Sequence, residues 1–438
     1  MRDDKMMHRS FAVAAILGAA LVMTVLMPAA AIAGGFSNPD FGARRMGMFA
    51  VTARPDDVTA VFHNPAGLTL QSGTEFYHAQ SWFFLDLGMK MYDSQGVLHP
   101  TDHEIRPDWS VGFIPFIGVA SDLGTERLRV GFGIYAPNAY GAALPGDEPT
   151  RYHATRALFI ASRATGSVAY KVSEKFSVGA SLHLIYVYMT ASRLMNPLVL
   201  QDPDRRFDDP SKLKPFDYKL KLDGHDWTWG FDLGVLFHPL DSLRIGAAFN
   251  SGSKIGLNGD VKLTAPDGSV TKARHQTDMT IPFALKGGIN WEFAPDFELG
   301  ADIYYWHYQV LQEQVSKLST PIMGMSEFRD PKAYGNSWSW NTGLLYRVIP
   351  PLELMFGFQM DFTPIPSRTY SLDNPSTDQK GVSWGARWQI NPDWRASLCF
   401  VRNWYNLVNV QDSQGTPPSN IKGHATNFEV AFDLQYKL

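Results

Sequence analysis

The sequence predicts a closed, 14-stranded antiparallel β-barrel that spans a membrane, with a small helical segment inside its lumen. Three observations lead to this all-β fold class. Long segments alternate apolar and polar residues, their apolar faces often begin or end in Trp or Tyr, and short and long connections alternate along the chain. Because side chains on a strand point alternately to opposite faces, such segments have one apolar and one polar side.

The alternation is clearest in the last segment of the chain. Its apolar face holds Phe428, Val430, Phe432, Leu434, Tyr436 and Leu438, and its polar face holds Asn427, Glu429, Asp433, Gln435 and Lys437. Residues 227–238 and 352–362 repeat the pattern. These segments run to about 10–16 residues, whereas strands in soluble proteins average about 5–6. Aromatic ends are typical of the girdles at membrane interfaces, so the pattern favours a membrane barrel over a soluble sandwich.

Six tight turns and seven longer polar stretches separate the alternating segments, which implies 14 strands. The longer stretches lie near 93–107, 137–155, 192–225, 258–277, 312–335, 365–380 and 411–422. Bacterial outer-membrane barrels have short periplasmic turns and longer extracellular loops. A barrel must close because lipid offers no partner to an unpaired strand edge. The even strand number places both ends of the barrel on the periplasmic side.

Residues 1–33 have the parts of a secretory signal: a basic start, an apolar stretch and small residues at the cleavage point. The mature protein is therefore expected to begin at Gly34, and the destination to be a Gram-negative outer membrane. Beyond the signal no apolar run reaches 18 residues, so no transmembrane helix is expected. The formal net charge of −4 gives no basic surface for nucleic acid, and a single Cys399 excludes an intrachain disulfide.

Residues 34–72 precede the first strand of the barrel at 73–438 and are expected to form a plug, or hatch, in its lumen. The motif residues in this segment are Asp56, Asp57, Asn64, Pro65 and Gly67. The two aspartates would begin a short helix, where carboxylates interact favourably with the helix dipole. The proline disfavours helical geometry at the asparagine before it, and the glycine permits the turn toward the first strand. The alternative is an ordinary periplasmic tail.

The stretch GMFAVTARPDDVTAVFHNPAGL resembles the N-terminal hatch signature of the FadL-type outer-membrane transporters of long-chain fatty acids and aromatic hydrocarbons. GIYAPNAYG at 133–141 is similar to the third strand of that family and its exit. Segments resembling the sixth, seventh and tenth to twelfth strands follow in order, so the likeness covers nearly the whole mature chain. The chain departs from the family pattern at Arg54-Pro55 and at His63, and it ends in Leu438 where outer-membrane proteins commonly end in Phe.

The resemblance implies passive uptake of a hydrophobic small molecule, most readily a long-chain fatty acid, without a cofactor. It places the N-terminal Gly34, Gly35 and Phe36 in the ligand pocket as a gate. Pro137 and Gly141 would interrupt the wall as a lateral exit, since proline lacks a ladder donor and glycine weakens pairing; a plain strand end is the alternative. Apolar residues of the loop at 192–225 would receive the ligand, or would only pack the loop onto itself. They are Leu194, Leu198, Leu200, Phe207 and Phe216.

Other functions remain open at this point. Aromatic hydrocarbons or alkanes would need the same apolar chemistry. A diffusion porin would line its water channel with inward charges, but these charges could equally hold the hatch by salt bridges: Arg244, Arg347, Arg387, Asp232, Glu353 and Asp361. An enzyme is not indicated, because the chain contains no H-E-x-x-H motif and no pair of cysteines. The expected partners are the ligand, outer-membrane lipid and the barrel-assembly machinery, with no metal or nucleic acid, and the protein is expected to be a monomer.

Overall fold

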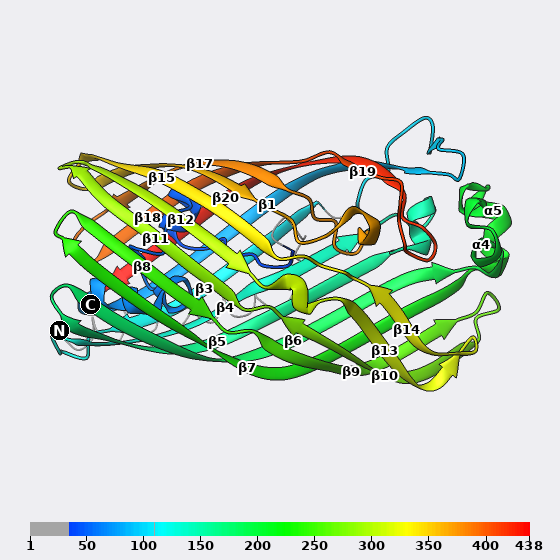
Figure 1. The fold of residues 1–438 in the computed structure, drawn as a ribbon, viewed down its shortest axis with the longest axis horizontal. Helices are drawn as coiled ribbons and strands as arrows, with labels where there is room; N and C mark the ends of the chain where they lie inside the picture. Colours follow the sequence, from blue (N-terminus) through cyan, green and yellow to red (C-terminus); the bar gives the residue numbers. More distant parts are fainter. Residues whose placement is uncertain (1–34, 109) are drawn as a thin grey trace, which may run out of the picture.

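The computed structural model describes residues 35–108 and 110–438, which form a closed antiparallel barrel (Figure 1). The predicted signal at 1–33 and Gly34 lie outside the described residues. Fourteen wall strands follow one another in chain order, and the wall closes where β20 (Ile421–Lys437) pairs with β1 (Thr74–Tyr92). The predicted fold class and strand number are confirmed. In the part of the chain that the structure describes, no helix has the length and apolar character to cross a membrane.

Nine wall strands are continuous, and five consist of two pieces. The continuous ones are β1, β3 (Val111–Ser121), β4 (Leu128–Ala143), β5 (Arg156–Ser173), β6 (Phe176–Met195), β7 (Tyr218–Leu240), β16 (Leu352–Asp361), β17 (Gln379–Gln389) and β20. The divided ones are β8 (Leu243–Asn250) with β9 (Ser253–Thr264), β10 (Val270–Ile281) with β11 (Ala284–Ala294), β12 (Phe297–Trp306) with β13 (Glu313–Ile322), β14 (Met325–Pro331) with β15 (Ser337–Ile349), and β18 (Trp394–Tyr405) with β19 (Val408–Val410). The short β2 (Leu98–His99) pairs with the end of β1.

The helices within residues 35–108 and 110–438 are all short. In the N-terminal segment they are α2 (Ala43–Met48), α3 (Ala60–His63) and the 3-10 turn η1 (Pro65–Leu70). In the connections they are η2 (Pro149–Tyr152), α4 (Pro197–Gln201), η3 (Pro203–Phe207), α5 (Pro210–Leu213), η4 (Lys214–Phe216), η5 (Tyr308–Val310) and η6 (Ser367–Thr369).

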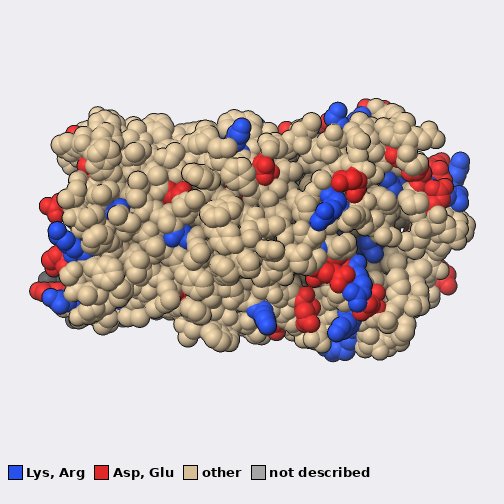
Figure 2. All heavy atoms as spheres, viewed as in Figure 1, with Lys and Arg blue, Asp and Glu red and all other residues tan. Residues whose placement is uncertain are grey.

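The outer surface of the wall is apolar, with tryptophans towards both ends. Trp227 and Trp229 of β7 are 60% and 65% exposed, and Phe231 and Leu233 follow them on the same outward face. Near the short turns, Trp388 of β17 is exposed in the same way. Figure 2 shows charged side chains sparsely over the middle of the wall and more densely at its two ends, most of all towards the loop end at the right. An apolar outer band with charged residues beyond it is typical of a barrel whose wall contacts lipid.

Two stretches predicted as loops, 258–277 and 312–335, are instead largely strand. The hairpin of β9 and β10 and that of β13 and β14 extend the wall beyond the tryptophan level. They keep the period-two alternation, as in buried Val261 beside exposed Lys262. Their outward face is charged because it no longer meets lipid, and that charge made the segments resemble loops.

Residues 35–72 run inside the barrel, where they appear in blue in Figure 1. Nearly all of them are buried, including the apolar Phe41 and Val58. The wall approaches this segment so closely that a side chain on Gly179 of β6 or Gly343 of β15 would collide with its backbone. The segment therefore fits against the inner face of the wall, in the position expected of a plug.

Candidate ligand-binding site

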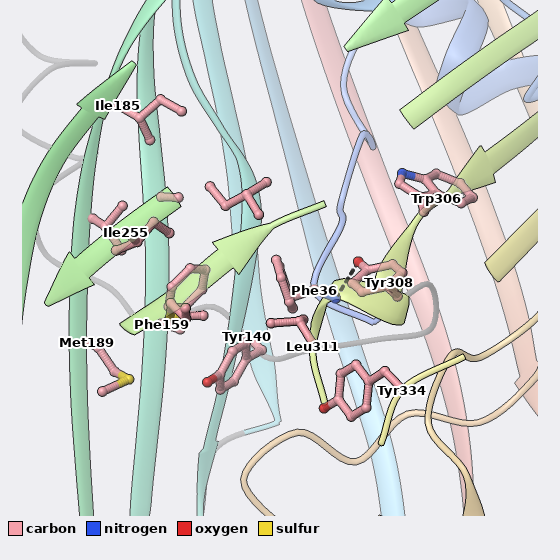
Figure 3. Close-up of a cluster of buried hydrophobic side chains, with 14 of the residues drawn as sticks. Phe36, Tyr140, Phe159, Ile185, Met189, Ile255, Trp306, Tyr308, Leu311 and Tyr334 are labelled. Atoms are coloured by element: carbon pink, nitrogen blue, oxygen red, sulfur yellow. Dashed lines mark hydrogen bonds between the residues drawn. The ribbon is translucent and has the colours of Figure 1, made fainter. Parts of the chain in front are cut away.

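Phe36 lies in an apolar pocket on the inner face of the wall (Figure 3). Its ring is 2% exposed, and its centroid lies 5.3 Å from that of Tyr308, 5.5 Å from Phe159 and 6.4 Å from Tyr140. Edge-to-face contacts between aromatic rings are favourable beyond the area they bury. The Phe36 backbone N–H also donates to the Tyr308 hydroxyl at 3.1 Å. Both the ring and the backbone of this residue are therefore held in the pocket.

The pocket is built from inward-facing apolar side chains of β4, β5, β6, β9, β10, β11 and β12, with connections folded over them. Its members besides Phe36 are Tyr140, Phe159, Ala161, Ile185, Val187, Met189, Ile255, Leu257, Met279, Ile281, Ala284, Tyr304, Trp306, Tyr308, Leu311, Tyr334 and Ile365. The strand residues among them come from two groups of consecutive strands, β4–β6 and β9–β12, whose inward side chains meet in one cluster inside the barrel. At this height the lumen thus contains an apolar site with several aromatic walls.

Two cations border the apolar cluster where it meets the N-terminal segment. Arg163 of β5 donates to Asn138 Oδ1 at 3.1 Å. The Lys286 ammonium of β11 lies 4.0 Å from the centre of the Phe62 ring. Both side chains line a small cavity of about 20 Å³ beside Trp306. Asp232, whose Oδ2 lies 3.5 Å from His183 Nδ1, adds one carboxylate to this group. The side chains around this cavity thus include two basic groups and one carboxyl group.

The wall is interrupted close to this pocket, because β3 and β4 pair over only part of their length. Their ladder stops at the pair Phe116–Tyr135, although β4 continues to residue 143. Pro115 of β3 and Pro137 of β4 lie just beyond that pair, and neither has an N–H to donate. The register between β4 and β5 also shifts next to Pro137. Within the described residues no ladder pair joins the remaining parts of β3 and β4.

The N-terminal segment supplies partners to β4 at this interruption. The Asn38 N–H donates to Pro137 O at 2.7 Å, and the Ala139 N–H donates to Phe36 O at 3.1 Å. Asn38 Nδ2 donates further to Ala139 O at 2.8 Å. Residues 36–38 thus pair with β4 from inside the barrel. Of the two predicted exit residues, Pro137 lies at the interruption, whereas Gly141 lies beyond it in regular register with β5.

Buried ion pairs fasten the segment to the wall near the short turns. Asp56 accepts from Arg387 of β17 at 3.0 Å and lies 2.9 Å from the Arg44 guanidinium. Glu298 of β12 contacts Arg44 and lies 2.7 Å from Arg54. The remaining wall members of this network are Arg244, Glu292, Arg347 and Glu353. Of the inward charges predicted either to line a channel or to hold the hatch, Arg387 pairs directly with the segment. Arg244, Arg347 and Glu353 join the same network through other wall residues. Asp232 lies in the pocket group instead, and Asp361 accepts from Gln379 at 3.4 Å.

Backbone groups of the segment are held as well. The carboxylate of Asp302 in β12 accepts from the N–H groups of Val51 and Thr52 at 2.7 and 2.9 Å. Asn64 Nδ2 donates both to Thr52 O at 2.9 Å and to Val235 O of β7 at 3.1 Å. The asparagine therefore joins the motif to another part of the segment and to the wall.

The two motif aspartates do not begin a helix, so that expectation is wrong. Helix α3 starts only at Ala60, and Asp57 Oδ1 instead accepts from the Thr59 N–H at 2.9 Å. Burial, with the neighbouring Asp56 charge, raises the pKa of Asp57. Burial alone would also raise the pKa of Asp56, but the guanidinium groups of Arg387 and Arg44 outweigh it and hold that pKa well below 3.8. Asp56 is thus an ionised anchor.

The Asn64-Pro65 pair ends α3, as predicted. It also starts η1, where Asn64 Oδ1 accepts from the Ala66 N–H at 3.2 Å. Gly67 lies within η1 and does not form the turn toward β1, so the role predicted for this glycine is wrong. A side chain there would collide with the ring of Pro55. Its small size is what lets the two parts of the segment pack together.

The loop residues expected to receive a ligand divide into two groups. Leu194 and Leu198 pack against a buried cluster within the loops, and Phe207 stacks on His99 with centroids 4.4 Å apart. Leu200 and Phe216 are 45% and 49% exposed. Three of the five apolar side chains predicted to receive a ligand are therefore used in packing the loops. Only Leu200 and Phe216 remain accessible to a molecule that approaches from the loop side.

A closed transmembrane barrel with an apolar internal site, a buried N-terminal segment in its lumen and an interrupted wall defines a class of outer-membrane transport barrels. The model of the outer membrane protein transport protein family (OMPP1/FadL/TodX) matches residues 24–438, and the chain belongs to this family. The family resemblance noted in the sequence is confirmed, and the family is one of transporters.

The relatives and solved structures cover most of the chain. The long-chain fatty acid transport protein of Salmonella typhi is 22% identical over 431 residues, which is 91% of this chain and 93% of that protein. That of Escherichia coli (strain K12) is 21% identical over 440 residues, with the same shares. A Pseudomonas aeruginosa FadL homologue has a TM-score of 0.80 at 18% identity, covering 92% of this chain and 100% of that one. The Pseudomonas putida toluene transporter TodX has a TM-score of 0.68 at 16% identity, covering 90% and 98%. At these identities the structural likeness shows the fold.

Proposed function

We propose that this protein carries hydrophobic small molecules passively across the outer membrane, with long-chain fatty acids as the preferred class. The observation that carries the proposal is the apolar pocket inside the barrel that the chain fills with its own Phe36. A ring that is 2% exposed marks a site into which an apolar group fits. A ligand would take the place of this ring, so that residues 34–36 act as the gate and residues 34–72 as the hatch.

The cations beside the pocket support a fatty acid over a neutral hydrocarbon. Arg163 and Lys286 face the same cavity, and Asp232 balances only one of them. A carboxylate would supply the missing negative charge while its alkyl chain occupies the apolar cluster. Ammonium and guanidinium groups bind carboxylates through charge-assisted hydrogen bonds, which are about twice as strong as neutral ones.

The aromatic walls of the pocket favour a second candidate, a monoaromatic hydrocarbon. Tyr140, Phe159 and Tyr308 already pack edge-on or tilted around the Phe36 ring, and they would accept a similar ring from outside. One of the solved relatives is described as a toluene transporter. Neither candidate needs the water-filled lumen of a diffusion porin.

The ligand would leave through the interruption between β3 and β4. Residues 36–38 pair with β4 next to it, and Pro115 and Pro137 prevent a regular ladder from sealing it. The ligand would be received from outside at Leu200 and Phe216. We also propose that residues 1–33 are removed on export and that the barrel-assembly machinery inserts the protein as a monomer.

The test compares uptake of labelled oleate, toluene and a sugar into liposomes that contain the purified protein. The double variant Arg163→Gln with Lys286→Gln should weaken oleate binding at least tenfold and leave toluene binding within twofold. Lys254→Gln with Lys317→Gln removes two exposed cations outside the pocket and is the matched control. Equal loss for oleate and toluene would contradict the carboxylate assignment, and uptake of sugar at the rate of oleate would contradict the transporter reading.

A further inference from the structure

The part of the wall that extends beyond the membrane carries a row of lysines on its outer face. Lys221 of β7 stands opposite Lys262 of β9, which in turn stands opposite Lys272 of β10. All three are exposed, and they alternate with residues directed into the lumen. Like charges directly opposite each other destabilise a sheet. Such a row is therefore unfavourable for the barrel unless something outside it supplies negative charge.

The barrel itself supplies little of that charge. Lys221 lies 2.8 Å from Asp223, but in the described part of the chain neither Lys262 nor Lys272 makes an ion pair. The outward-facing charged residues next to the row are Lys219, Arg274, Asp260 and the partly buried Asp223. With the row they make five cations against two carboxylates. This surface thus has a net charge of +3 on a chain whose formal net charge is −4.

The outward face of β7 fixes the height of the row above the membrane. Lys221 precedes the exposed Trp227 by six residues on the same face, and tryptophans mark the membrane interface. At about 3.3 Å per residue and a strand tilt of about 40°, the row lies about 15 Å beyond the Trp227 level. This is above the hydrocarbon region, in the layer of large polar headgroups, and Figure 2 shows charged side chains gathered at that end.

We propose that the row Lys221–Lys262–Lys272 binds the phosphate groups of an anionic glycolipid headgroup in the outer leaflet. Three ammonium groups on adjacent strands span two strand spacings, or about 9–10 Å. Each is a compact charge with three donors that can turn toward phosphate oxygens. A headgroup with more than one phosphate matches both the spacing and the surplus charge, and its binding removes the repulsion within the row. A lipid that surrounds the barrel is always present beside this surface.

The test uses full-length protein purified in a detergent free of glycolipid and titrated with lipopolysaccharide in mixed micelles. The triple variant K221Q/K262Q/K272Q should bind roughly 100-fold more weakly, because each basic residue near an anionic lipid surface contributes several-fold to affinity. The triple variant K171Q/K175Q/K437Q removes the same charge at the short-turn end and is the matched control. Its affinity should stay within about threefold of wild type. The Lys→Arg triple variant of the row should keep most of the binding.

Two further measurements separate a lipid site from a loss of fold or a general charge effect. Without glycolipid, the K221Q/K262Q/K272Q protein should be at least as heat-stable as wild type, since the repulsion is gone. Added lipopolysaccharide should then raise the Tm of wild type and not that of the variant, and dephosphorylated lipopolysaccharide should have no effect on either. Equal losses in both triple variants, equal binding of the dephosphorylated lipid, or equally tight binding of inorganic phosphate alone would overturn the proposal.

Discussion

Replacing Phe36 by Ala tests whether the chain's own residue occupies the ligand site. The Phe36 ring is 2% exposed and lies against Tyr308 and Phe159. Truncating a buried Phe to Ala costs about 3–5 kcal/mol in protein cores. We take about 3 kcal/mol here, because the end of a segment adjusts more freely than a core element. That change would raise the population of molecules with a vacant pocket by roughly 100-fold.

A ligand that must displace the ring binds with an affinity reduced by the fraction of molecules whose pocket is vacant. Phe36→Ala should therefore tighten oleate binding, by up to roughly 100-fold, in titration calorimetry of the detergent-solubilised protein. Tyr308→Phe keeps the ring but removes the hydroxyl that accepts from the Phe36 N–H, so a gain of about fivefold is expected from about 1 kcal/mol. Phe41→Ala, a buried aromatic of the same segment outside the pocket, is the control. Unchanged or weaker oleate binding by a folded Phe36→Ala protein would refute the reasoning.

Four further outcomes are expected. Asp56→Asn removes the carboxylate that Arg44 and Arg387 share. Breaking a buried ion pair costs about 3–5 kcal/mol. Protease should therefore cleave the N-terminal segment of this variant faster than that of wild type, while the barrel stays intact. Because the pKa of Asp56 is depressed in the folded state, its ion pairs stabilise the segment fully above about pH 4. Hydrogen-exchange protection of residues 35–72 should therefore be flat from pH 8 to 5 and be lost only well below pH 3.8; a loss near pH 6 would contradict this. Pro115→Val restores an N–H at the wall interruption and should slow oleate uptake without changing oleate affinity, whereas unchanged uptake would argue against this exit. Sequencing of the protein from outer-membrane fractions should begin at Gly34, and an intact Met1 would contradict cleavage.

The barrel could be predicted because lipid imposes one simple rule on every strand. In β20, Phe432 faces outward at 38% exposed while its neighbour Asp433 is 2% exposed, and that alternation is visible in the sequence. The rule fails where lipid ends. Lys262 continues the same alternation with a charge outside, so β9 and β10 resembled a loop. Period two, rather than outward hydrophobicity, was the signal that would have found them.

The site was less accessible to sequence reasoning, because its members meet only through strand register. Arg163 and Lys286 are 123 positions apart in the sequence and face one cavity only in the closed barrel. Tyr308 contacts Phe36 across a sequence separation of 272. Pro115 carried a signal that could have been used, since proline in the middle of a strand marks a missing ladder bond. Pro137 was predicted from the same rule, and the two together define the interruption.

The residues that fill the pocket also hold the interrupted wall, and this sets a condition on the ligand. Phe36 places its ring among Tyr308 and Phe159 while its carbonyl accepts from the Ala139 N–H. A ligand that displaces the ring therefore also removes a main-chain partner of β4 at the interruption. A ligand shifts this equilibrium only by as much as it binds the open state better. To offset about 3 kcal/mol of ring packing, it must bury about four CH₂ groups at about 0.8 kcal/mol each. Under the proposed function, short-chain acids should occupy the pocket poorly, and uptake should rise steeply once the chain exceeds that length. Equal uptake of butyrate and oleate would show that the wall opens without displacing Phe36.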